Sequence, residues 1–385
     1  MRIVHVALLH PPWDVRIFEK EARELAAAGH EVHLLAAGTT DEVRDGVQLH
    51  CIGSDHKTTN IRSRLWLAIH RGWRALRSAL ALRPDVVHLH EVQAIPAGLV
   101  IKLLGVRVVY DVHEEAFWEK LSNCRNLGIF RLGYIFAGIA ALLEVLAKLS
   151  FDGFVAATPH IGHQFPRRRT AVVQNFPRRG GRQHSGPLNP LATGPDRENI
   201  CLFAGNLFAT RGAREMIEAV AGLPAEFRAQ LVIAGRFVPP SLEVQLSRID
   251  GWRNVTYKGW LPRARLDDLW KRARLAFVLF QPSPEHRNAY PNKLFEAMAA
   301  GVPVVASDFP LWRSIIEPAG CGVLVDPADP TAITAAVREL LQHPLEAAQM
   351  GAAGAEAVRQ RYNWENEAGK LLKFYQQFTT TGERS

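Results

Sequence analysis

The sequence has 385 residues, of which 48% are hydrophobic and 22% are charged, and this balance excludes collagen-like, coiled-coil and disordered chains. A chain of this length folds as two domains rather than around one core. The formal net charge of +8 favours anionic partners such as nucleotide diphosphates, nucleic acid or acidic lipid headgroups. The four cysteines lie far apart without a CxxC pair, which indicates a reduced cytoplasmic protein without a zinc site.

Short β-branched apolar runs alternate with amphipathic stretches through the first half of the chain. This alternation is typical of parallel βαβ units. The expected strands start at Ile3, Glu31, Asp85, Val106 and Gly153. They predict an N-terminal Rossmann-like domain over residues 1–176.

The segment 60–82 predicts a helix with a basic side that carries Arg71, Arg74 and Arg77. The expected apolar face consists of Leu65, Ile69, Trp73, Leu76 and Leu80. One interpretation is an interfacial helix on acidic lipid headgroups. The other, which we favour, is a Rossmann helix that docks its apolar face on the sheet while the arginines meet water.

The apolar segment 127–147 is almost long enough to span a bilayer. Arg131 and Glu144 interrupt it, and central charges are costly in a bilayer. A sheet strand also follows at Gly153. We therefore expect a buried or membrane-edge helix.

Residues 177–198 are crowded with Pro, Gly and polar residues and are predicted to be a linker. A second Rossmann-like domain is predicted over residues 199–363. The strands of this domain are expected to start at Ile200, Ala229, Asn254, Leu275, Val302 and Cys321. Residues 364–385 are predicted to form a C-terminal helix and tail that can fold with either domain. The sequence thus predicts an α/β fold of two doubly wound parallel sheets that face a cleft, because ligands bind outside the carboxyl ends of parallel strands.

The segment 282–306, PSPEHRNAYPNKLFEAMAAGVPVVA, gives the strongest functional signal. A strand is expected to end near Phe280, and a helix to begin near Pro291 after a polar loop. The positive end of such a helix and its free N–H groups bind diphosphates. Glu296 follows within the helix and can accept two ribose hydroxyls.

Together with GNLFATRG at 205–212, this segment resembles the donor-binding half of the family-four retaining glycosyltransferases, which have the GT-B fold. The family's two acidic positions, separated by seven residues, fall here on Asn288 and Glu296. Its two diphosphate-binding cations fall on Asn206 and Arg211. The resemblance implies that Arg211 stabilises the leaving diphosphate, and Lys293 is the candidate for the missing cation.

The resemblance extends to individual side chains. The implied donor-binding residues are Gly205, Asn206, Arg211, Asn288, Asn292, Lys293, Leu294 and Glu296. The implied catalytic residues are His113, Arg211, Lys293 and Glu296. Each has an ordinary alternative: a solvated helix carboxylate for Glu296, a helix-capping residue for Arg211, a surface or turn residue for Lys293 and Asn288, and a core histidine for His113.

The N-terminal half carries further family features. Residues 14–36 look like the family's first helix and second strand, preceded by HPPWD in place of a glycine-rich loop. His113 resembles the histidine that contacts the transferred sugar, and Asn175 resembles the asparagine that opens the interdomain linker. The acceptor-side candidates are Asp14, Arg16, His90 and Glu114. On the strand HLHE, His88 is expected to pack and His90 to reach the cleft.

The chain lacks a DxD triplet after a strand, so the expected enzyme is metal-independent and neutralises the diphosphate with cationic side chains and a helix N-terminus. The resemblance implies retaining transfer, without a cofactor, from a nucleotide-diphosphate sugar to a glycan or lipid-linked acceptor in cell-surface polysaccharide biosynthesis. A nucleotide-sugar 2-epimerase and a non-catalytic sugar-nucleotide-binding protein are the alternatives. Nucleic acid is not expected as a partner, because the basic residues do not cluster with stacking aromatics. We expect a cytoplasmic protein with peripheral contact to the anionic inner face of the cell membrane.

Overall fold

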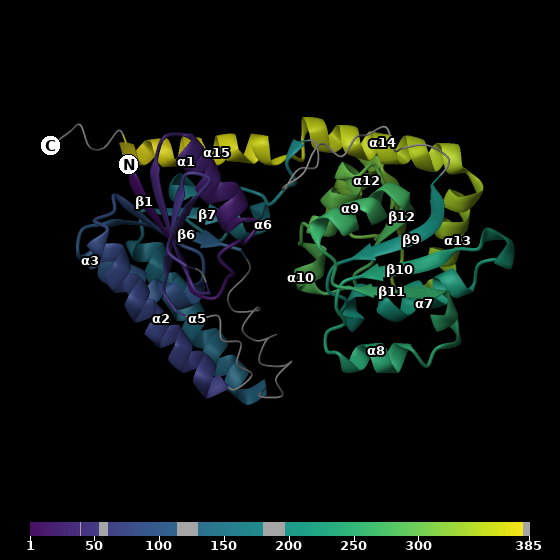
Figure 1. Ribbon diagram of the computed structural model, residues 1–385, viewed down its shortest axis with the longest axis horizontal. Coiled ribbons are helices and arrows are strands. Elements are labelled where there is room, and N and C mark those ends of the chain that lie inside the picture. Colours follow the sequence, from purple (N-terminus) through teal and green to yellow (C-terminus); the bar gives the residue numbers. More distant parts are fainter. Residues whose placement is uncertain (39, 54–60, 114–129, 180–196, 380–385) are drawn as a thin grey trace. The chain divides into compact units, whose positions relative to one another are not determined.

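The computed structural model describes residues 1–38, 40–53, 61–113, 130–179 and 197–379. The chain divides into two compact units: unit 1 is residues 1–175 with 365–385, and unit 2 is residues 176–364. Each unit is built on one largely parallel sheet covered by helices, as the sequence predicts (Figure 1). Most of the predicted linker, residues 180–196, lies outside the described residues.

The described part of unit 1 contains an eight-stranded sheet in the order β3-β4-β2-β1-β5-β6-β7-β8. Its strands are β1 (Arg2–Ala7), β2 (Glu31–Ala36), β3 (Glu42–Arg44), β4 (Val47–Cys51), β5 (Val86–Leu89), β6 (Arg107–Val112), β7 (Gly153–Ala156) and β8 (Thr170–Val172). Only β3 pairs antiparallel in this described sheet. The strands β3, β4 and β8 are not predicted from the sequence. β3 and β8 have only three residues each, whereas the alternation of apolar and polar residues in β4 is a usable strand signal.

Helices cover both faces of the unit 1 sheet (Figure 1). On one face α2 (Ile61–Ala81), α3 (Ile95–Leu103) and α5 (Phe130–Ser150) form a core with the sheet. On the other lie the π-helix η1 (Ile17–Ala22), α1 (Arg23–Ala27) and α15 (Trp364–Thr379). The shorter segments are η2 (Val92–Ala94), α6 (Pro159–Gly162) and η3 (Arg167–Arg169).

Helix α2 has the predicted range, but its predicted faces are only partly correct. Leu76 packs in the core and Leu80 against it, as expected, and Arg74 and Arg77 are exposed. Ile69 and Trp73, also expected on the buried face, are 65% and 59% exposed. Arg71, expected on the solvated side, is buried and donates through Nη1 to Leu8 O at 2.9 Å. Ala75 and Ala79, which are not predicted to be buried, also pack in the core. Small alanines let the helix approach the sheet, and counting large apolar residues does not reveal them; the Leu65 side chain is outside the described part of the chain.

The last helix, α15, packs on unit 1 although it follows unit 2 in the sequence. The Tyr375 hydroxyl lies 2.7 Å from Nδ1 of His88, and Glu367 Oε2 accepts the Gln174 N–H at 2.9 Å. A Cβ on Gly153 would stand 2.5 Å from Cζ of Phe374. Glycine at this position therefore allows β7 and α15 to approach each other.

Unit 2 contains a six-stranded parallel sheet among its described residues, in the order β11-β10-β9-β12-β13-β14. Its strands are β9 (Glu198–Ala204), β10 (Gln230–Ala234), β11 (Val255–Gly259), β12 (Ala273–Val278), β13 (Val304–Ser307) and β14 (Gly322–Val325). Each corresponds to a strand that the sequence predicts. The order places β9 and β12 in the centre, so the loops that follow them share one edge.

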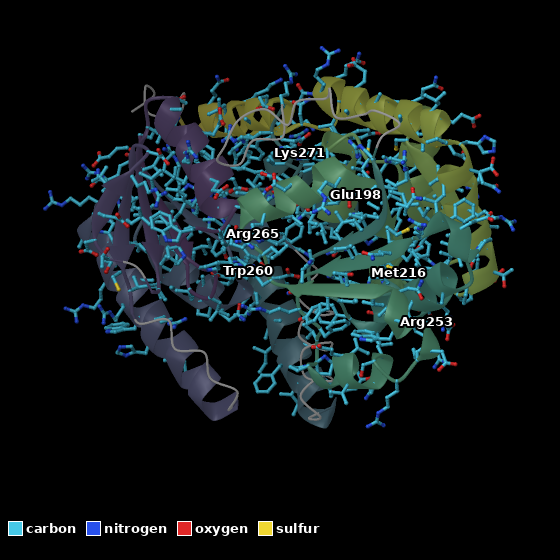
Figure 2. The ribbon with its side chains drawn as sticks, turned by 45° about the vertical axis from the view of Figure 1, so that its right-hand side comes forward. Glu198, Met216, Arg253, Trp260, Arg265 and Lys271 are labelled. Carbon is cyan, nitrogen blue, oxygen red and sulfur yellow. The ribbon has the colours of Figure 1, made fainter. Side chains whose placement is uncertain are left out.

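Helices also cover both faces of the unit 2 sheet. One core contains residues of α9 (Arg263–Arg272), α11 (Asn292–Ala299), α12 (Pro310–Ala319) and α14 (Pro344–Gln360), and the other contains residues of α7 (Ala213–Ala221), α8 (Ser241–Leu246) and α13 (Pro330–Gln342). The shorter segments are η6 (Ala209–Arg211), η7 (Ala225–Phe227), η8 (Asp250–Asn254) and α10 (Pro284–Arg287). In Figure 2, Met216 marks α7, where it is fully buried, and Glu198 marks the start of β9. Glu198 Oε2 accepts from Arg272 Nη2 at 2.8 Å.

Candidate active site

The predicted donor-binding residues lie at the carboxyl-end edge of the unit 2 sheet. β9 ends at Ala204, and the chain then turns through Gly205 toward η6 and Arg211. Gly205 has a φ of +112°, a conformation that favours glycine. β12 leads through α10 to α11, which carries Lys293 near its start. Because both central strands are parallel, their loops bring two cationic side chains to one edge.

Lys293 lies with its ammonium group against the backbone of Gly205. A Cβ on Gly205 would stand 2.7 Å from Nζ of Lys293, so a larger residue here would displace the ammonium group. Nζ also lies 5.4 Å from the centroid of the Phe203 ring. Burial, helped by the positive charge of Arg211, lowers the pKa of Lys293 to about 8. An anionic ligand beside this ammonium group would stabilise the protonated form and so raise the pKa of Lys293 again.

Arg211, at the end of η6, is the second cation of this edge. Its guanidinium carbon lies 4.7 Å from the Phe208 ring centroid and 5.2 Å from that of Phe280. Its Nη1 donates to Asn206 O at 2.7 Å. Aromatic rings and a carbonyl therefore fix the orientation of the guanidinium, a group suited to bidentate phosphate binding.

The N-terminus of α11 adds backbone donors to the two cations. Its N-cap residue, Pro291, provides no side-chain cap. Asn292, the first helical residue, is exposed. The positive end of a helix dipole and the first-turn N–H groups attract anions. This edge of unit 2 thus combines three kinds of group that bind a diphosphate.

Glu296 lies one turn beyond Lys293 on α11. Its side chain is 30% exposed, and Oε1 is 3.8 Å from Nη1 of Arg263. Arg263 also pairs with Asp267 at 3.0 Å. The sequence analysis misses Arg263, because an arginine at the start of an amphipathic helix is typical of a solvated surface. The exposed part of the Glu296 carboxylate remains open to hydroxyl groups of a ligand.

The structure places two further predicted donor residues. The Leu294 side chain is fully buried in the unit 2 core, and the Leu294 N–H donates to Pro291 O at 3.0 Å. The side chain packs α11 on the sheet, and a donor contact by Leu294 stays a prediction. Asn288 is exposed at the C-cap of α10, four residues before α11 begins at Asn292.

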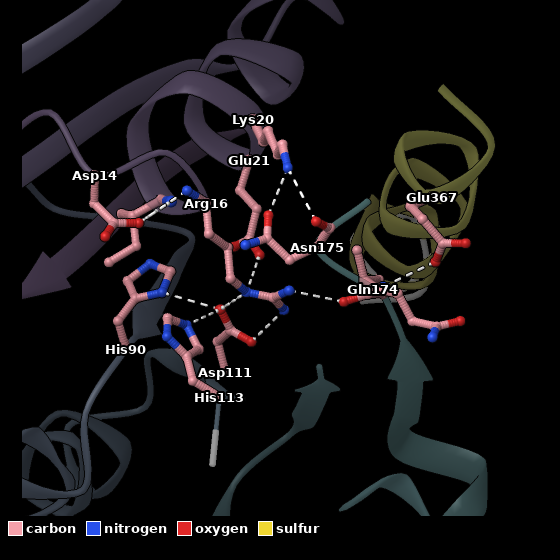
Figure 3. Close-up of polar contacts among 12 residues, drawn as sticks. Asp14, Arg16, Lys20, Glu21, His90, Asp111, His113, Gln174, Asn175 and Glu367 are labelled. Carbon is pink, nitrogen blue, oxygen red and sulfur yellow. Dashed lines mark hydrogen bonds and ion pairs between the residues drawn. The ribbon is translucent and has the colours of Figure 1, made fainter. Parts of the chain in front are cut away.

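Unit 1 holds a second polar centre, built on Asp111 at the end of β6 (Figure 3). The Asp111 carboxylate accepts from Arg16 at 2.7 and 3.0 Å, from His90 Nδ1 at 3.2 Å and from His113 Nε2 at 2.6 Å. Burial opposes ionisation of Asp111, but Arg16 and His113 outweigh it and hold its pKa well below the ordinary value. The sequence analysis does not single out Asp111, although an acid inside a run of β-branched residues is a usable signal.

His113 follows β6 directly and is the most accessible member of this centre, with 20% of its side chain exposed. Its ring centroid lies 5.2 Å from that of His10 and 5.7 Å from that of His90. Because Nε2 is held by Asp111, the carboxylate fixes the orientation of the ring. Glu114, the acceptor-side candidate that follows, lies outside the described residues.

The π-helix η1 directs Arg16 and Glu21 to the same side. The Glu21 N–H donates to Arg16 O at 2.9 Å, the i to i+5 spacing of a π-turn, and Arg16 Nε lies 3.0 Å from Glu21 Oε1. Arg16 Nη1 also donates to Val173 O at 2.8 Å, and the side chain is only 5% exposed. The Arg16 guanidinium therefore positions Asp111, and an acceptor contact by Arg16 stays a prediction.

His90 is buried as well, in a stack of three histidines. Its Nε2 lies 2.9 Å from Nδ1 of His5, and its ring lies 4.6 Å from that of His88. The parallel register of β1 and β5 pairs His5 with His88. Asp111 holds the other nitrogen of His90, and an acceptor contact by this residue stays a prediction. Burial lowers the pKa of all three histidines.

Asp14 and Glu91 shape the loop between β1 and η1. Asp14 Oδ1 accepts the N–H groups of Arg16 and Ile17 at 2.8 and 3.0 Å, so it caps the helix. The Glu91 carboxylate accepts from the N–H groups of Leu8, Leu9 and His10 at 3.0, 2.9 and 3.1 Å. Glu91 is not among the residues predicted from the sequence. Its carboxylate holds the HPPWD loop that takes the place of a glycine-rich one, and an acceptor role for Asp14 stays a prediction.

The interdomain asparagine of the resemblance is tied to unit 1. Asn175 Oδ1 accepts from Lys20 Nζ at 2.6 Å, and Asn175 O lies 3.3 Å from the same nitrogen. Lys20 is 1% exposed on η1. The contact fixes the chain where it leaves unit 1.

Two groups of described side chains offer metal-ligand atoms within 4.8 Å of one another. They are His5, Glu21, His88 and His90, and His90, Asp111 and His113. The Arg16 guanidinium lies against both carboxylates of these groups. A fixed cation at this position disfavours a divalent ion, because like charges repel strongly in a buried site. The predicted absence of a metal stays a prediction.

The chain matches two families of known proteins. Residues 15–176 match "Glycosyltransferase Family 4", and residues 192–357 match "Glycosyl transferases group 1". Glycogen synthase of Mycobacterium tuberculosis is 24% identical over 410 residues, covering 97% of this chain and 94% of that protein. Phosphatidyl-myo-inositol mannosyltransferase of Mycobacterium leprae is 31% identical over 197 residues, covering 50% of each.

Solved structures agree with these matches at the level of the fold. Sucrose-phosphate synthase of Thermosynechococcus elongatus aligns over 99% of both chains with a TM-score of 0.77 and 17% identity. HepE of Anabaena in complex with UDP-glucose aligns over 98% of this chain and 100% of that chain, with a TM-score of 0.69 and 14% identity. Both similarities support the predicted GT-B fold.

Proposed function

This chain belongs to the group 1 glycosyltransferases of the GT-B fold, and from that premise we propose that it transfers a sugar from a nucleotide-diphosphate donor with retention of configuration. The observation that carries the proposal is the edge of unit 2 where Arg211, Lys293 and the start of α11 meet. Glycosyl transfer itself follows from the family, whereas the stereochemistry and the roles of individual residues are our proposal.

The donor diphosphate binds to the cations and the helix terminus of unit 2. Lys293 is held beside Gly205 in apolar surroundings, and Arg211 is oriented by two aromatic rings. Glu296, one turn further on α11, accepts hydrogen bonds from the ribose hydroxyls. UDP-glucose bound to HepE of Anabaena is consistent with a nucleotide-sugar donor.

The glycosidic bond to the diphosphate breaks as negative charge develops on the leaving oxygen. Arg211 and Lys293 stabilise this charge, and they interact more strongly with it in the transition state than in the ground state. The acceptor hydroxyl attacks the anomeric carbon from the face that the diphosphate leaves. The leaving phosphate oxygen takes the hydroxyl proton, and His113 contacts the transferred sugar.

The reaction needs neither a metal ion nor a cofactor, because side-chain cations and a helix dipole meet the charge on the diphosphate. Activity is therefore expected to persist in EDTA. Loss of activity in EDTA that Mg²⁺ or Mn²⁺ restores would show that the diphosphate requires a cation which the protein does not supply.

Unit 1 binds the acceptor, which we propose to be a glycan or a lipid-linked sugar in cell-surface polysaccharide biosynthesis. The phosphatidyl-myo-inositol mannosyltransferase of Mycobacterium leprae, by its name, acts on a lipid. We place the enzyme in the cytoplasm, where thiols stay reduced, and the described cysteines Cys51, Cys201 and Cys321 are free. We also propose peripheral contact with an anionic membrane.

The direct test is a thermal-shift panel of UDP-, GDP-, ADP- and dTDP-sugars, followed by transfer assays with the stabilising donor. A donor at 100-fold excess over its Kd stabilises the protein by about 2.7 kcal/mol. Arg211→Ala should lower kcat more than it weakens donor binding. Interconversion of the donor without an acceptor would instead indicate a 2-epimerase, and binding without turnover would indicate a non-catalytic protein.

A further inference from the structure

Helix α5 exposes an apolar stripe to solvent. The positions of this stripe follow helical spacing and carry no charged side chain. Its large members are Tyr134 (52% exposed), Ile135 (58%), Ile139 (50%), Leu142 (59%), Val145 (50%), Leu146 (38%) and Leu149 (76%). A helix on the surface of a soluble protein normally shows the reverse arrangement, with its apolar stripe inside.

The charged residues of α5 whose side chains the structure describes lie toward the protein instead. Glu144 is buried, and Lys148 is half-buried with Nζ 4.4 Å from the Phe165 ring centroid. The small residues Ala137, Ala140 and Ala147 are also buried and hold the helix on unit 1. Because one face of α5 belongs to this folded unit, the helix cannot cross a bilayer without unfolding the unit, although its length and hydropathy suffice to span one.

The apolar surface continues onto two neighbouring helices. α3 packs against both α2 and α5 (Figure 1). At its end Leu103 and Leu104 are 86% and 60% exposed, and Val100 is 42% exposed. On α2, Ile69 and Trp73 are 65% and 59% exposed. We call this set, with the α5 stripe, the apolar surface of unit 1; exposed apolar side chains gathered on packed neighbouring helices are typical of an interaction site.

The charges beside this surface indicate what covers it. On α2, Arg74 and Arg77 are exposed, next to Trp73 and one helical turn beyond it. Exposed tryptophan beside arginine is typical of a helix that lies at the boundary between lipid and water. An anionic lipid surface satisfies both features, since acyl chains accept the apolar side chains and headgroups pair with the arginines.

We propose that the apolar surface of unit 1 inserts into one leaflet of an anionic bilayer, with Arg74 and Arg77 at the headgroups. The inference develops the membrane contact of the proposed function, and it names the side chains that make it. It does not depend on glycosyl transfer, because lipid binding is measured without donor or acceptor. Docking through unit 1 would bring the acceptor-binding unit to a lipid-linked acceptor.

The test is flotation of the full-length protein with vesicles of phosphatidylcholine alone or mixed with phosphatidylglycerol. We expect binding to the mixed vesicles, weakened by high salt. The triple variant Ile135→Ser, Ile139→Ser, Leu142→Ser should lower the partition coefficient about a hundredfold, because three apolar side chains no longer enter the acyl region. Arg74→Glu with Arg77→Glu should lower it about tenfold or more and remove the preference for anionic lipid.

The matched control is Val244→Ser with Leu345→Ser, which removes exposed apolar side chains of unit 2 (56% and 64% exposed) and should leave lipid binding unchanged. Thermal unfolding and donor binding of each variant show whether the fold is retained. Wild-type binding to neither vesicle, or unchanged binding of the triple variant, would overturn the proposal. A wild-type dimer that the triple variant converts to a monomer, without any lipid binding, would assign the surface to a second copy of the chain.

Discussion

Arg16 and Asp111, which lie 95 residues apart in the sequence, form a buried two-point ion pair with contacts of 2.7 and 3.0 Å. The pair joins the π-helix η1 to the end of β6. His113 depends on the same carboxylate for its orientation. Stability of unit 1 and the geometry of a proposed catalytic residue are therefore linked through one acid.

Removing one partner of this pair should be costly. Arg16→Met leaves Asp111 buried without its guanidinium, and we expect a loss of about 3 to 5 kcal/mol in the free energy of unfolding. Asp111→Asn should cost a similar amount, and the double variant should lose less than the sum of the two. Urea denaturation of the four proteins measures this coupling, and strict additivity would show that the two side chains do not stabilise each other. Glu218→Gln, in the exposed pair with Arg214, is the control and should change stability little.

The pH dependence of donor use should reveal Lys293. Burial and the neighbouring Arg211 lower the pKa of Lys293 to about 8 in the free protein. Above that pH the side chain loses its proton and its attraction for the diphosphate, so kcat/KM for the donor should fall as the pH rises through about 8. In Lys293→Arg the guanidinium stays charged, and the alkaline fall should disappear. An identical alkaline limb in both proteins would assign the titration to another group.

Much of the fold follows from the sequence because parallel strands are short, continuous apolar runs. The role of segment 282–306 can also be predicted from the sequence, because the strand end, the loop and the start of α11 follow one another in the chain. The centre at Asp111 is different, because its contacts come from residues 16, 90, 111 and 113 on separate elements. No spacing rule connects such positions before the topology is known. The orientation of α2 is hidden for a related reason: its core contacts use Ala75 and Ala79 beside Leu76, while Ile69 and Trp73 face solvent.

Glu296→Ala should weaken donor binding by about 1.5 to 3 kcal/mol, because it removes charge-assisted hydrogen bonds to the ribose. Isothermal titration with the preferred donor measures the change. The alternative is that Glu296 serves only to pair with Arg263, 3.8 Å away. In that case Arg263→Ala and Glu296→Ala would have the same effect. We expect Arg263→Ala to retain most of the affinity, which separates the two roles.

The stacked histidines should make the protein less stable in mild acid. His5, His88 and His90 are buried, and burial lowers the pKa of each below the value of about 6.5 for a free side chain. Below about pH 6.5 these histidines therefore bind more protons in the unfolded chain than in the folded chain. The free energy of unfolding should consequently fall as the pH drops from about 7 to 5. Each such histidine contributes up to about 1.4 kcal/mol per pH unit. Glu21, whose pKa is raised by burial and by Asp111, acts in the opposite direction.

Urea midpoints between pH 8 and pH 5 measure this slope. The double variant His88→Leu, Tyr375→Phe removes one histidine together with its hydrogen-bond partner, so no buried hydroxyl is left without its bond to His88. It should reduce the slope by about one proton. His163→Gln is the matched control, because that exposed ring meets water in both the folded and the unfolded chain. If the double variant kept the full wild-type slope, the stack would have to bind protons in the folded state, contrary to its burial.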